Sequence, residues 1–179
     1  YIPVMEYEDS ARNCWAPEIT YDAKKKIYMI YWATTIPGRF AVGDTSGDSK
    51  YNHRMYCVTT KNFKDFSKTK LLYDKGFNVI DASIVPDGNR FIMFLKDETR
   101  YPPQKNIRIA TSTKLKKGFT EASVPITGNY WAEGPTAVKI GNQWIVYFDK
   151  YTAHKYGAVV SADLVSWQDV SDKIQMPAG

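Results

Sequence analysis

The chain has 179 residues, a length that suits one domain with a substantial hydrophobic core. Hydrophobic residues make up 44% of it and charged residues 24%, a balance that excludes an intrinsically disordered protein. A net charge of +5 is compatible with nucleic-acid binding. The lysines, however, lie in short groups such as Ala23–Lys26 and Lys114–Gly118, at expected turns, which is typical of solvated loop tips. We therefore expect no nucleic-acid partner.

Three other features of the composition limit the class of protein. Aromatic residues reach 15%, which fits either packing within β-sheets or a surface that stacks on sugars. Cys14 and Cys57 are too few for a disulfide framework or a zinc site, and the sequence leaves open whether they are free or bridged. No apolar run is long enough to span a bilayer, so no membrane partner is expected. The sequence gives no prediction of oligomeric state.

The first organised segment is "WAPEITYDAKKKIYMIYWATT" (Trp15–Thr35). A short strand, a turn and a run of β-branched and aromatic residues follow one another, which predicts a hairpin. Two further strands are expected after it, within "RMYCVTTKNFKDF" (Arg54–Phe66) and "TKLLYD" (Thr69–Asp74).

The same order of features occurs twice more. The second hairpin is "IDASIVPDGNRFIMFLKDET" (Ile80–Thr99), followed by a third strand within Ile107–Phe119. The third hairpin is "EGPTAVKIGNQWIVYFDKYT" (Glu133–Thr152), followed by a third strand within Gly157–Trp167. The chain therefore contains an internal repeat of about four strands per unit.

The spacing of the repeat predicts the architecture. Aligning Pro17, Ala82 and Pro135 places the units 65 and 53 positions apart, and the longer spacing comes from an insertion at Ile36–Lys50. Four short strands repeated in this way are typical of β-propeller blades, whereas the strands of a β-sandwich, the alternative, need not recur in sets of four. We predict an all-β fold with about three four-stranded antiparallel blades in one propeller domain, at roughly 15–74, 77–127 and 131–175.

The repeat also predicts where a functional site lies. In a propeller the innermost strand of each blade lines the central channel, so the starts of these strands meet at one mouth. Trp15, Asp81 and Glu133 occupy those positions. Both acidic residues have apolar neighbours, where a charge is costly unless it is paired or used. One interpretation is that they are two carboxylates of a pocket, the smallest set of catalytic groups that a glycosidase needs. The alternative is that they are buried caps that accept hydrogen bonds from backbone N–H groups.

These motifs resemble glycoside hydrolase family 43, the five-bladed propeller enzymes that remove arabinose or xylose from plant polysaccharides. The resemblance rests on "WAPEI" (Trp15–Ile19), "NVIDASI" (Asn78–Ile84), "EGPTAVKIGNQWIVYF" (Glu133–Phe148) and "SADLVSWQDVS" (Ser161–Ser171), in the family's order. Because propellers have roughly four to eight blades, the chain is expected to cover part of one.

The resemblance implies an inverting hydrolysis of a carbohydrate substrate. We expect no cofactor, and no metal site can be assigned from the sequence. Glu133 corresponds to the general acid and Asp81 to the modulator of its pKa. The expected substrate-binding residues are Trp15, Phe77, Arg100, Trp131 and His154.

The general base of the family comes from a blade before "WAPEI", outside this chain, so the isolated segment is expected to be inactive. The alternative is a propeller that binds carbohydrate without cleaving it. A polysaccharide substrate favours a secreted, periplasmic or cell-surface protein over a cytoplasmic one. The first residues, "YIPVMEYE", are expected to come from the middle of a protein, so the lack of a visible signal peptide says nothing about secretion.

Overall fold

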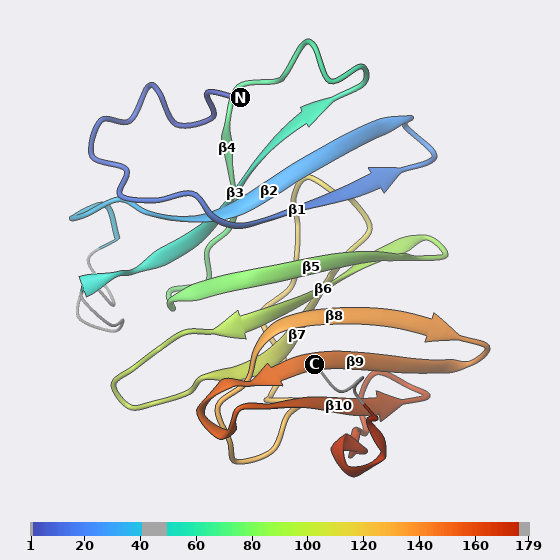
Figure 1. The fold of residues 1–179 in the computed structure, drawn as a ribbon. Coiled ribbons are helices and arrows are strands. Elements are labelled where there is room, and N and C mark those ends of the chain that lie inside the picture. Colours follow the sequence, from blue (N-terminus) through green and yellow to red (C-terminus); the bar gives the residue numbers. More distant parts are fainter. Residues whose placement is uncertain (1, 41–49, 176–179) are drawn as a thin grey trace.

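A computed structural model describes residues 2–40 and 50–175. They form three antiparallel β-sheets that lie one beside another, with two short 3-10 helices, η2 (Tyr151–Ala153) and η3 (Ser171–Lys173) (Figure 1). Within these two ranges no helix is long and apolar enough to cross a membrane. The expected all-β fold is therefore confirmed.

The first sheet contains β1 (Trp15–Asp22), β2 (Ile27–Thr35), β3 (His53–Thr60) and β4 (Lys70–Tyr73), paired in chain order. The hairpin expected from "WAPEITYDAKKKIYMIYWATT" is present, because β1 and β2 pair from Trp15 with Ala33 to Asp22 with Ile27. Most of the insertion at Ile36–Lys50 lies outside the described residues.

The second sheet contains β5 (Val79–Asp87), β6 (Arg90–Asp97) and β7 (Asn106–Ser112). The segment expected to provide its fourth strand is irregular, yet it still bonds to β7. In this segment, the residues whose N–H groups bond to β7 are three positions apart, whereas the β7 residues whose carbonyls accept these bonds are two positions apart. The segment therefore has one extra residue between successive bonds, compared with a regular ladder. The bonds run from the N–H groups of Thr120, Ser123 and Ile126 to the carbonyls of Thr111, Ile109 and Ile107.

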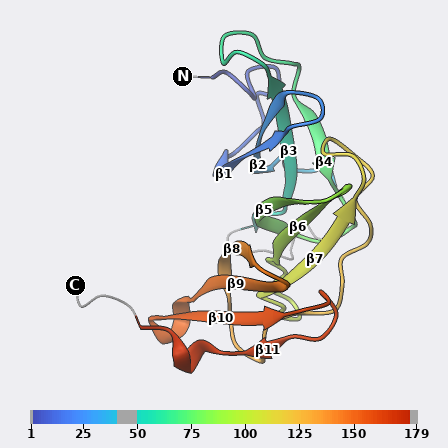
Figure 2. The same ribbon diagram turned by 90° about the vertical axis from the view of Figure 1, so that its right-hand side faces the viewer.

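The third sheet contains β8 (Glu133–Ile140), β9 (Gln143–Lys150), β10 (Lys155–Ser161) and a short β11 (Gln168–Asp169). Figure 2 shows the three sheets fanning outward from β1, β5 and β8, which lie together along one side. The starts of these three inner strands are therefore close in space, as a propeller requires.

The middle sheet is buried on both faces, which explains the continuous apolar run "FIMFL" on β6. Side chains of a strand alternate between its two faces. On β6, Met93 and Leu95 pack into the cluster shared with the first sheet. Ile92 and Phe94 pack on the opposite face into the cluster shared with the third sheet, where the Phe94 ring lies 6.0 Å from that of Trp144.

A buried hydrogen-bond cluster joins the first two sheets. The Tyr31 hydroxyl on β2 accepts a hydrogen bond from the Ile84 N–H on β5 at 2.9 Å. Thr20 on β1 donates its hydroxyl to the Ile84 carbonyl at 2.8 Å and lies 3.1 Å from the Tyr31 oxygen. Both backbone groups of Ile84 are thus satisfied by side chains of the neighbouring blade.

Replacing Tyr31 with Phe tests this connection. The Tyr31→Phe variant retains the ring but leaves the buried Ile84 N–H without its acceptor, so we expect unfolding to require about 1–2 kcal/mol less free energy. Urea denaturation measures the change. Tyr28→Phe, on a half-buried residue of the same strand, is the matched control, and an equal loss in both variants would contradict the assignment.

Candidate active site

Each inner strand begins with the same irregularity. The pairing register shifts just after the first residues of β1, β5 and β8, so that one strand bulges relative to its partner. The residue at the same place in each bulge has a left-handed backbone: Ala16 with φ 47°, Asp81 with φ 53° and Gly134 with φ 58°. Glycine adopts this conformation freely, whereas alanine and aspartate do so under strain, and such strain is typical of functional sites.

The two expected carboxylates lie at the bulges of two neighbouring blades. Glu133 lies at the start of β8, directly before the bulge residue Gly134. The Gly134 N–H donates a hydrogen bond to Oδ2 of Asp81 at 3.2 Å, across the gap between β5 and β8. Asp81 is therefore bonded to the residue adjacent to Glu133.

A buried lysine connects Glu133 to a third carboxylate. Lys96 on β6 donates from Nζ to Oε2 of Glu133 at 2.9 Å, and its Nζ lies 2.6 Å from Oε2 of Glu98. The other oxygen of Glu98 forms an ion pair with Lys105. The side chains of Lys96 and Lys105 are only 4% and 1% exposed, so these ion pairs are largely withdrawn from water. Four charges thus alternate in sign from Glu133 to Lys105.

The surroundings shift the pKa values of two groups at the mouth. Burial opposes the charge on Lys96, but Glu98 and Glu133 outweigh burial and raise the pKa of the ammonium above its usual range. Burial raises the pKa of Asp81, and the charges of Glu133 and Glu98 raise it further against the opposing effects of Lys96 and the Gly134 N–H. Asp81 therefore retains a proton more readily than an ordinary aspartate.

Trp131 and Arg100, both expected in the site, lie together beside this charge cluster. The Arg100 guanidinium lies 4.8 Å from the centre of the Trp131 ring, and Nζ of Lys105 lies 5.7 Å from it. The ring of Tyr151 approaches Trp131 at 5.9 Å and Nζ of Lys96 at 4.9 Å. Cations therefore hold Trp131 in place at the Lys105 end of this cluster.

Trp15 forms a separate aromatic surface at the start of β1. Its side chain is 45% exposed, and its ring lies 4.7 Å from Tyr51 and 5.4 Å from His53. Arg12 covers Tyr51 at 4.3 Å from the ring centre. An exposed tryptophan that neighbouring rings hold in place is suited to stacking on an apolar sugar face.

The structure does not bring the other two expected residues to the carboxylates. Phe77 packs against the core between the first two sheets, 6.2 Å from the ring of Tyr73. His154 is exposed after η2, with a left-handed backbone. Among the described residues, no hydrogen bond or ring contact joins either side chain to Glu133 or Asp81.

Sequence reasoning missed Lys96, although the repeat contains a signal for it. Lys96 pairs with Ile80 across the hairpin, at the place where the other units have Ala33 and Asp149. A lysine at the end of the apolar run "FIMFL" is costly to bury without partners. The partner Glu98 lies only two residues further along, so the pair could have been identified from the sequence.

His53, at the start of β3, was also missed. Its backbone N–H and its Nδ1 lie 2.8 and 3.1 Å from Oδ1 of Asn78, so Nδ1 carries the proton of the neutral ring. Nε2 is buried and has no hydrogen-bond partner among the described residues. Burial lowers the pKa of His53 to about 4, with Lys96 and Lys105 adding to the effect and Asn78 and Glu98 opposing it.

Metal binding has no obvious place in the described parts of the chain. No group of three His, Cys, Asp or Glu side chains with a suitable arrangement occurs there. The groups that the described residues place at the mouth are carboxyl groups, lysines and aromatic rings.

The three sheets are those of a β-propeller, of which this chain covers part. The chain matches, over residues 2–179, the family described as "Probable glycosyl hydrolase domain", which is related to glycoside hydrolase family 43. It belongs to this family. No curated protein matches the sequence.

Many solved structures have a similar fold, among them the following three. They are a GH43 β-1,3-galactosidase (15% identity, TM-score 0.64), the catalytic domain of the Coprinopsis cinerea GH62 α-L-arabinofuranosidase (12%, 0.60) and the GH43 protein BlXynB from Bacillus licheniformis (17%, 0.64). The matches cover 89%, 87% and 88% of this chain, and 32%, 49% and 29% of those chains. The chain thus spans half or less of each structure, and identities this low show the fold alone.

The neutral, buried state of His53 predicts a pH dependence of stability. The unfolded chain protonates His53 below about pH 6.5 and the folded chain only below about pH 4, so the unfolded state binds the extra proton between these values. The stabilisation that comes from the neutral His53 is therefore fully present above about pH 6.5, and it is lost as the pH falls toward 4. Between about pH 7.5 and pH 5 we expect His53 to account for a loss of about 2 kcal/mol.

Urea denaturation of the wild type and of His53→Gln at both pH values measures this difference. The carboxylates titrate in both proteins, so the comparison isolates the histidine. Equal losses in the two proteins would contradict the buried neutral ring.

Proposed function

We propose that the protein containing this chain is a glycosidase that cleaves arabinose- or xylose-containing polysaccharides or oligosaccharides. The observation that carries the proposal is the approach of two carboxylates at adjacent bulges, through the hydrogen bond from the Gly134 N–H to Asp81. A glycosidase needs a general acid that holds a proton at its working pH, and a second carboxyl group close to that acid helps it to do so. The exposed ring of Trp15 supports a sugar-stacking position at the same mouth.

In this proposal Glu133 is the general acid, which protonates the leaving glycosidic oxygen. Asp81 orients the substrate and adjusts the acid through its charge, which is consistent with the raised pKa of Asp81 and its interaction with Glu133. Lys96 contacts both Glu133 and Glu98, so it can remain paired with Glu98 when Glu133 receives a proton.

The general base is proposed to lie outside residues 1–179. Within the described residues, Glu98 is occupied by Lys96 and Lys105, and Asp97 is paired with Arg108. Neither is free to activate a water. Inversion requires this water on the face of the sugar opposite the acid, with the two carboxyl groups roughly 6.5–9.5 Å apart.

The solved structures of similar fold act on different sugars. The GH62 relative in fold is an α-L-arabinofuranosidase, whereas one GH43 relative is a β-1,3-galactosidase. We propose arabinose or xylose because the motifs around Trp15, Asp81 and Glu133 resemble those of enzymes that release these pentoses.

A propeller that binds carbohydrate without cleaving it is the second candidate. The ion pair of Lys96 with Glu133 favours it, because a carboxylate held by an ammonium accepts hydrogen bonds from sugar hydroxyls. Binding of oligosaccharides in calorimetry, without hydrolysis of any aryl glycoside by the complete protein, would select this candidate.

Glu133→Gln tests the acid in the protein with its propeller complete. Glycosides with poor leaving groups need protonation, so we expect their hydrolysis to fall by roughly a hundredfold or more. Dinitrophenyl glycosides, whose leaving group departs without a proton, should lose far less. Steady-state rates with arabinofuranosides and xylosides of both kinds measure the difference.

Glu121→Gln is the matched control, since Glu121 is exposed and pairs only with Lys75 among the described residues. It should retain full activity. Undiminished hydrolysis of a poor-leaving-group substrate by Glu133→Gln would overturn the assignment.

A further inference from the structure

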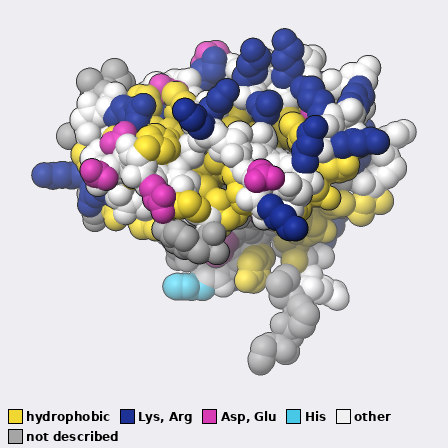
Figure 3. Space-filling view, turned by 90° about the horizontal axis from the view of Figure 1, so that it is seen from above, with side chains coloured by type: hydrophobic (Ala, Val, Ile, Leu, Met, Phe, Trp, Pro, Cys, Tyr) yellow, Lys and Arg dark blue, Asp and Glu magenta, His cyan; other side chains and the backbone are white. Residues whose placement is uncertain are grey.

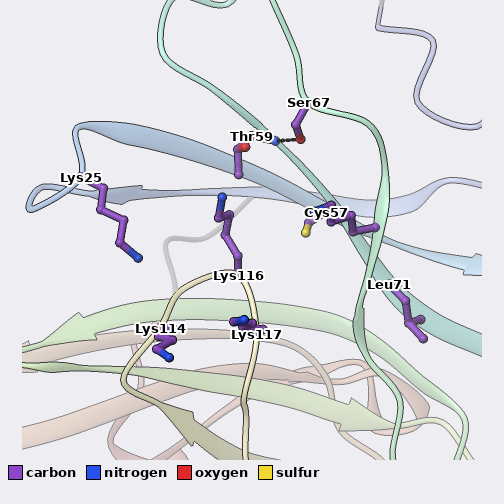
Figure 4. Close-up of a pocket in the computed structure, with 9 residues that line it drawn as sticks. Lys25, Cys57, Thr59, Ser67, Leu71, Lys114, Lys116 and Lys117 are labelled. Atoms are coloured by element: carbon purple, nitrogen blue, oxygen red, sulfur yellow. Dashed lines mark hydrogen bonds between the residues drawn. The ribbon is translucent and has the colours of Figure 1, made fainter.

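A cleft lies between the first two sheets, away from the carboxylates. Its volume is about 510 Å³ (Figure 4). Five lysines contribute to its lining, and no acidic residue does. The lining residues are Lys25, Lys70, Lys114, Lys116 and Lys117, together with Cys57, Thr59, Ser67 and Leu71.

The cleft lies at the end of the sheets opposite the mouth. Lys25 belongs to the turn between β1 and β2, whereas Trp15 is at the other end of β1. A strand of this length extends on the order of 20 Å. Lys114, Lys116 and Lys117 follow the end of β7, whose start lies on the mouth side. The cleft is therefore separate from the candidate active site.

The turn that carries three of the lysines is fixed in position. Leu115, between them, is fully buried in the core shared by the first two sheets. The Ser112 hydroxyl accepts from the Lys114 N–H at 3.0 Å and donates to the Lys117 carbonyl at 2.7 Å. Because the backbone is held at both ends, the lysines on either side of Leu115 must point outward.

Few negative charges lie close enough to these lysines to neutralise their positive charge. Lys25 has one distant partner, Asp22 at 3.8 Å. Among the described residues, no carboxylate lies within ion-pair distance of the four others. In Figure 4, Lys25 and Lys116 extend toward the space between their loops, and Figure 3 shows Lys and Arg side chains gathered along one margin of the molecule. Like charges held this close repel one another, and a bound anion relieves the repulsion.

The thiol in the cleft does not supply chemistry of its own. Both cysteines are free, Cys14 exposed and Cys57 buried. Burial raises the pKa of Cys57 to about 11 against the opposing charges of Lys116 and Lys70, so the thiol stays protonated at neutral pH. The cleft is therefore suited to binding and not to nucleophilic attack.

We propose that this cleft binds an acidic polysaccharide through the carboxylates of its uronic acid residues. Each lysine is a point charge that suits a single carboxylate, and the hydroxyls of Thr59 and Ser67 can bond to sugar hydroxyls. Single-stranded nucleic acid fits less well, because no aromatic side chain for base stacking and no arginine lines the cleft. The cleft would hold an acidic chain while the opposite face carries the active site.

The test compares two triple variants of the full chain with the same net charge. One is Lys114→Gln, Lys116→Gln and Lys117→Gln, and the control is Lys139→Gln, Lys155→Gln and Lys173→Gln in the third blade. In affinity electrophoresis through polygalacturonate, we expect binding by the cleft variant to be about tenfold weaker than that of the wild type. The control should bind within about twofold of the wild type, and binding by the wild type should weaken as salt is added.

Each other outcome opposes the proposal. Equal losses in both triple variants mean that only net charge attracts the polymer. If the wild type binds a neutral arabinan as tightly as polygalacturonate, the cleft does not recognise charge. If it binds an oligothymidylate more tightly than polygalacturonate, the ligand is nucleic acid instead. Glu133→Gln should leave polygalacturonate binding unchanged, which separates this proposal from the glycosidase proposal.

Discussion

The ion pairs of Lys96 are the interaction on which the candidate site depends. A nearly buried ammonium is stable only with anionic partners, and Lys96 has Glu98 on its own blade and Glu133 on the next. The same charge faces Asp81 and partly offsets the effect of burial on that carboxyl. Lys96 therefore links the second and third blades electrostatically at the mouth, where the Gly134 N–H also donates a hydrogen bond to the Asp81 side chain.

The bulges explain why the carboxylates occur at this place in the fold. A regular strand would alternate its side chains between the two faces of the blade, and both faces of the middle blade are packed with apolar residues. A left-handed residue at the start of the strand interrupts the alternation and leaves Asp81 out of that packing. The third blade uses a glycine at the equivalent position, so its carboxylate is carried one residue earlier, by Glu133.

The sequence predicted the propeller fold and the neighbouring positions of Asp81 and Glu133, because both follow from the repeat. Strand alternation and turn residues identify the hairpins, and alignment of Pro17, Ala82 and Pro135 matches the three bulges.

The partners of the carboxylates were not predicted. Lys96 has a signal in its place at the end of an apolar run, but its ion pair with Glu133 lies between two blades. The burial of Lys105 and His53 has no signal within a single repeat. The positions of Phe77 and His154 also depend on loop conformation, which strand periodicity does not determine. The fourth segment of the second sheet departs from the repeat because its residues exceed the spacing that a regular ladder allows.

A ¹³C NMR titration of the labelled Asp81 carboxyl, in the wild type and in Lys96→Met, tests the central claim most directly. A buried Asp81 beside Glu133 must titrate above its ordinary value of 3.8 in the wild type. Removing the Lys96 ammonium, which favours the charged form, must move the titration higher still. An Asp81 that titrates at or below its ordinary value in the wild type would contradict the account.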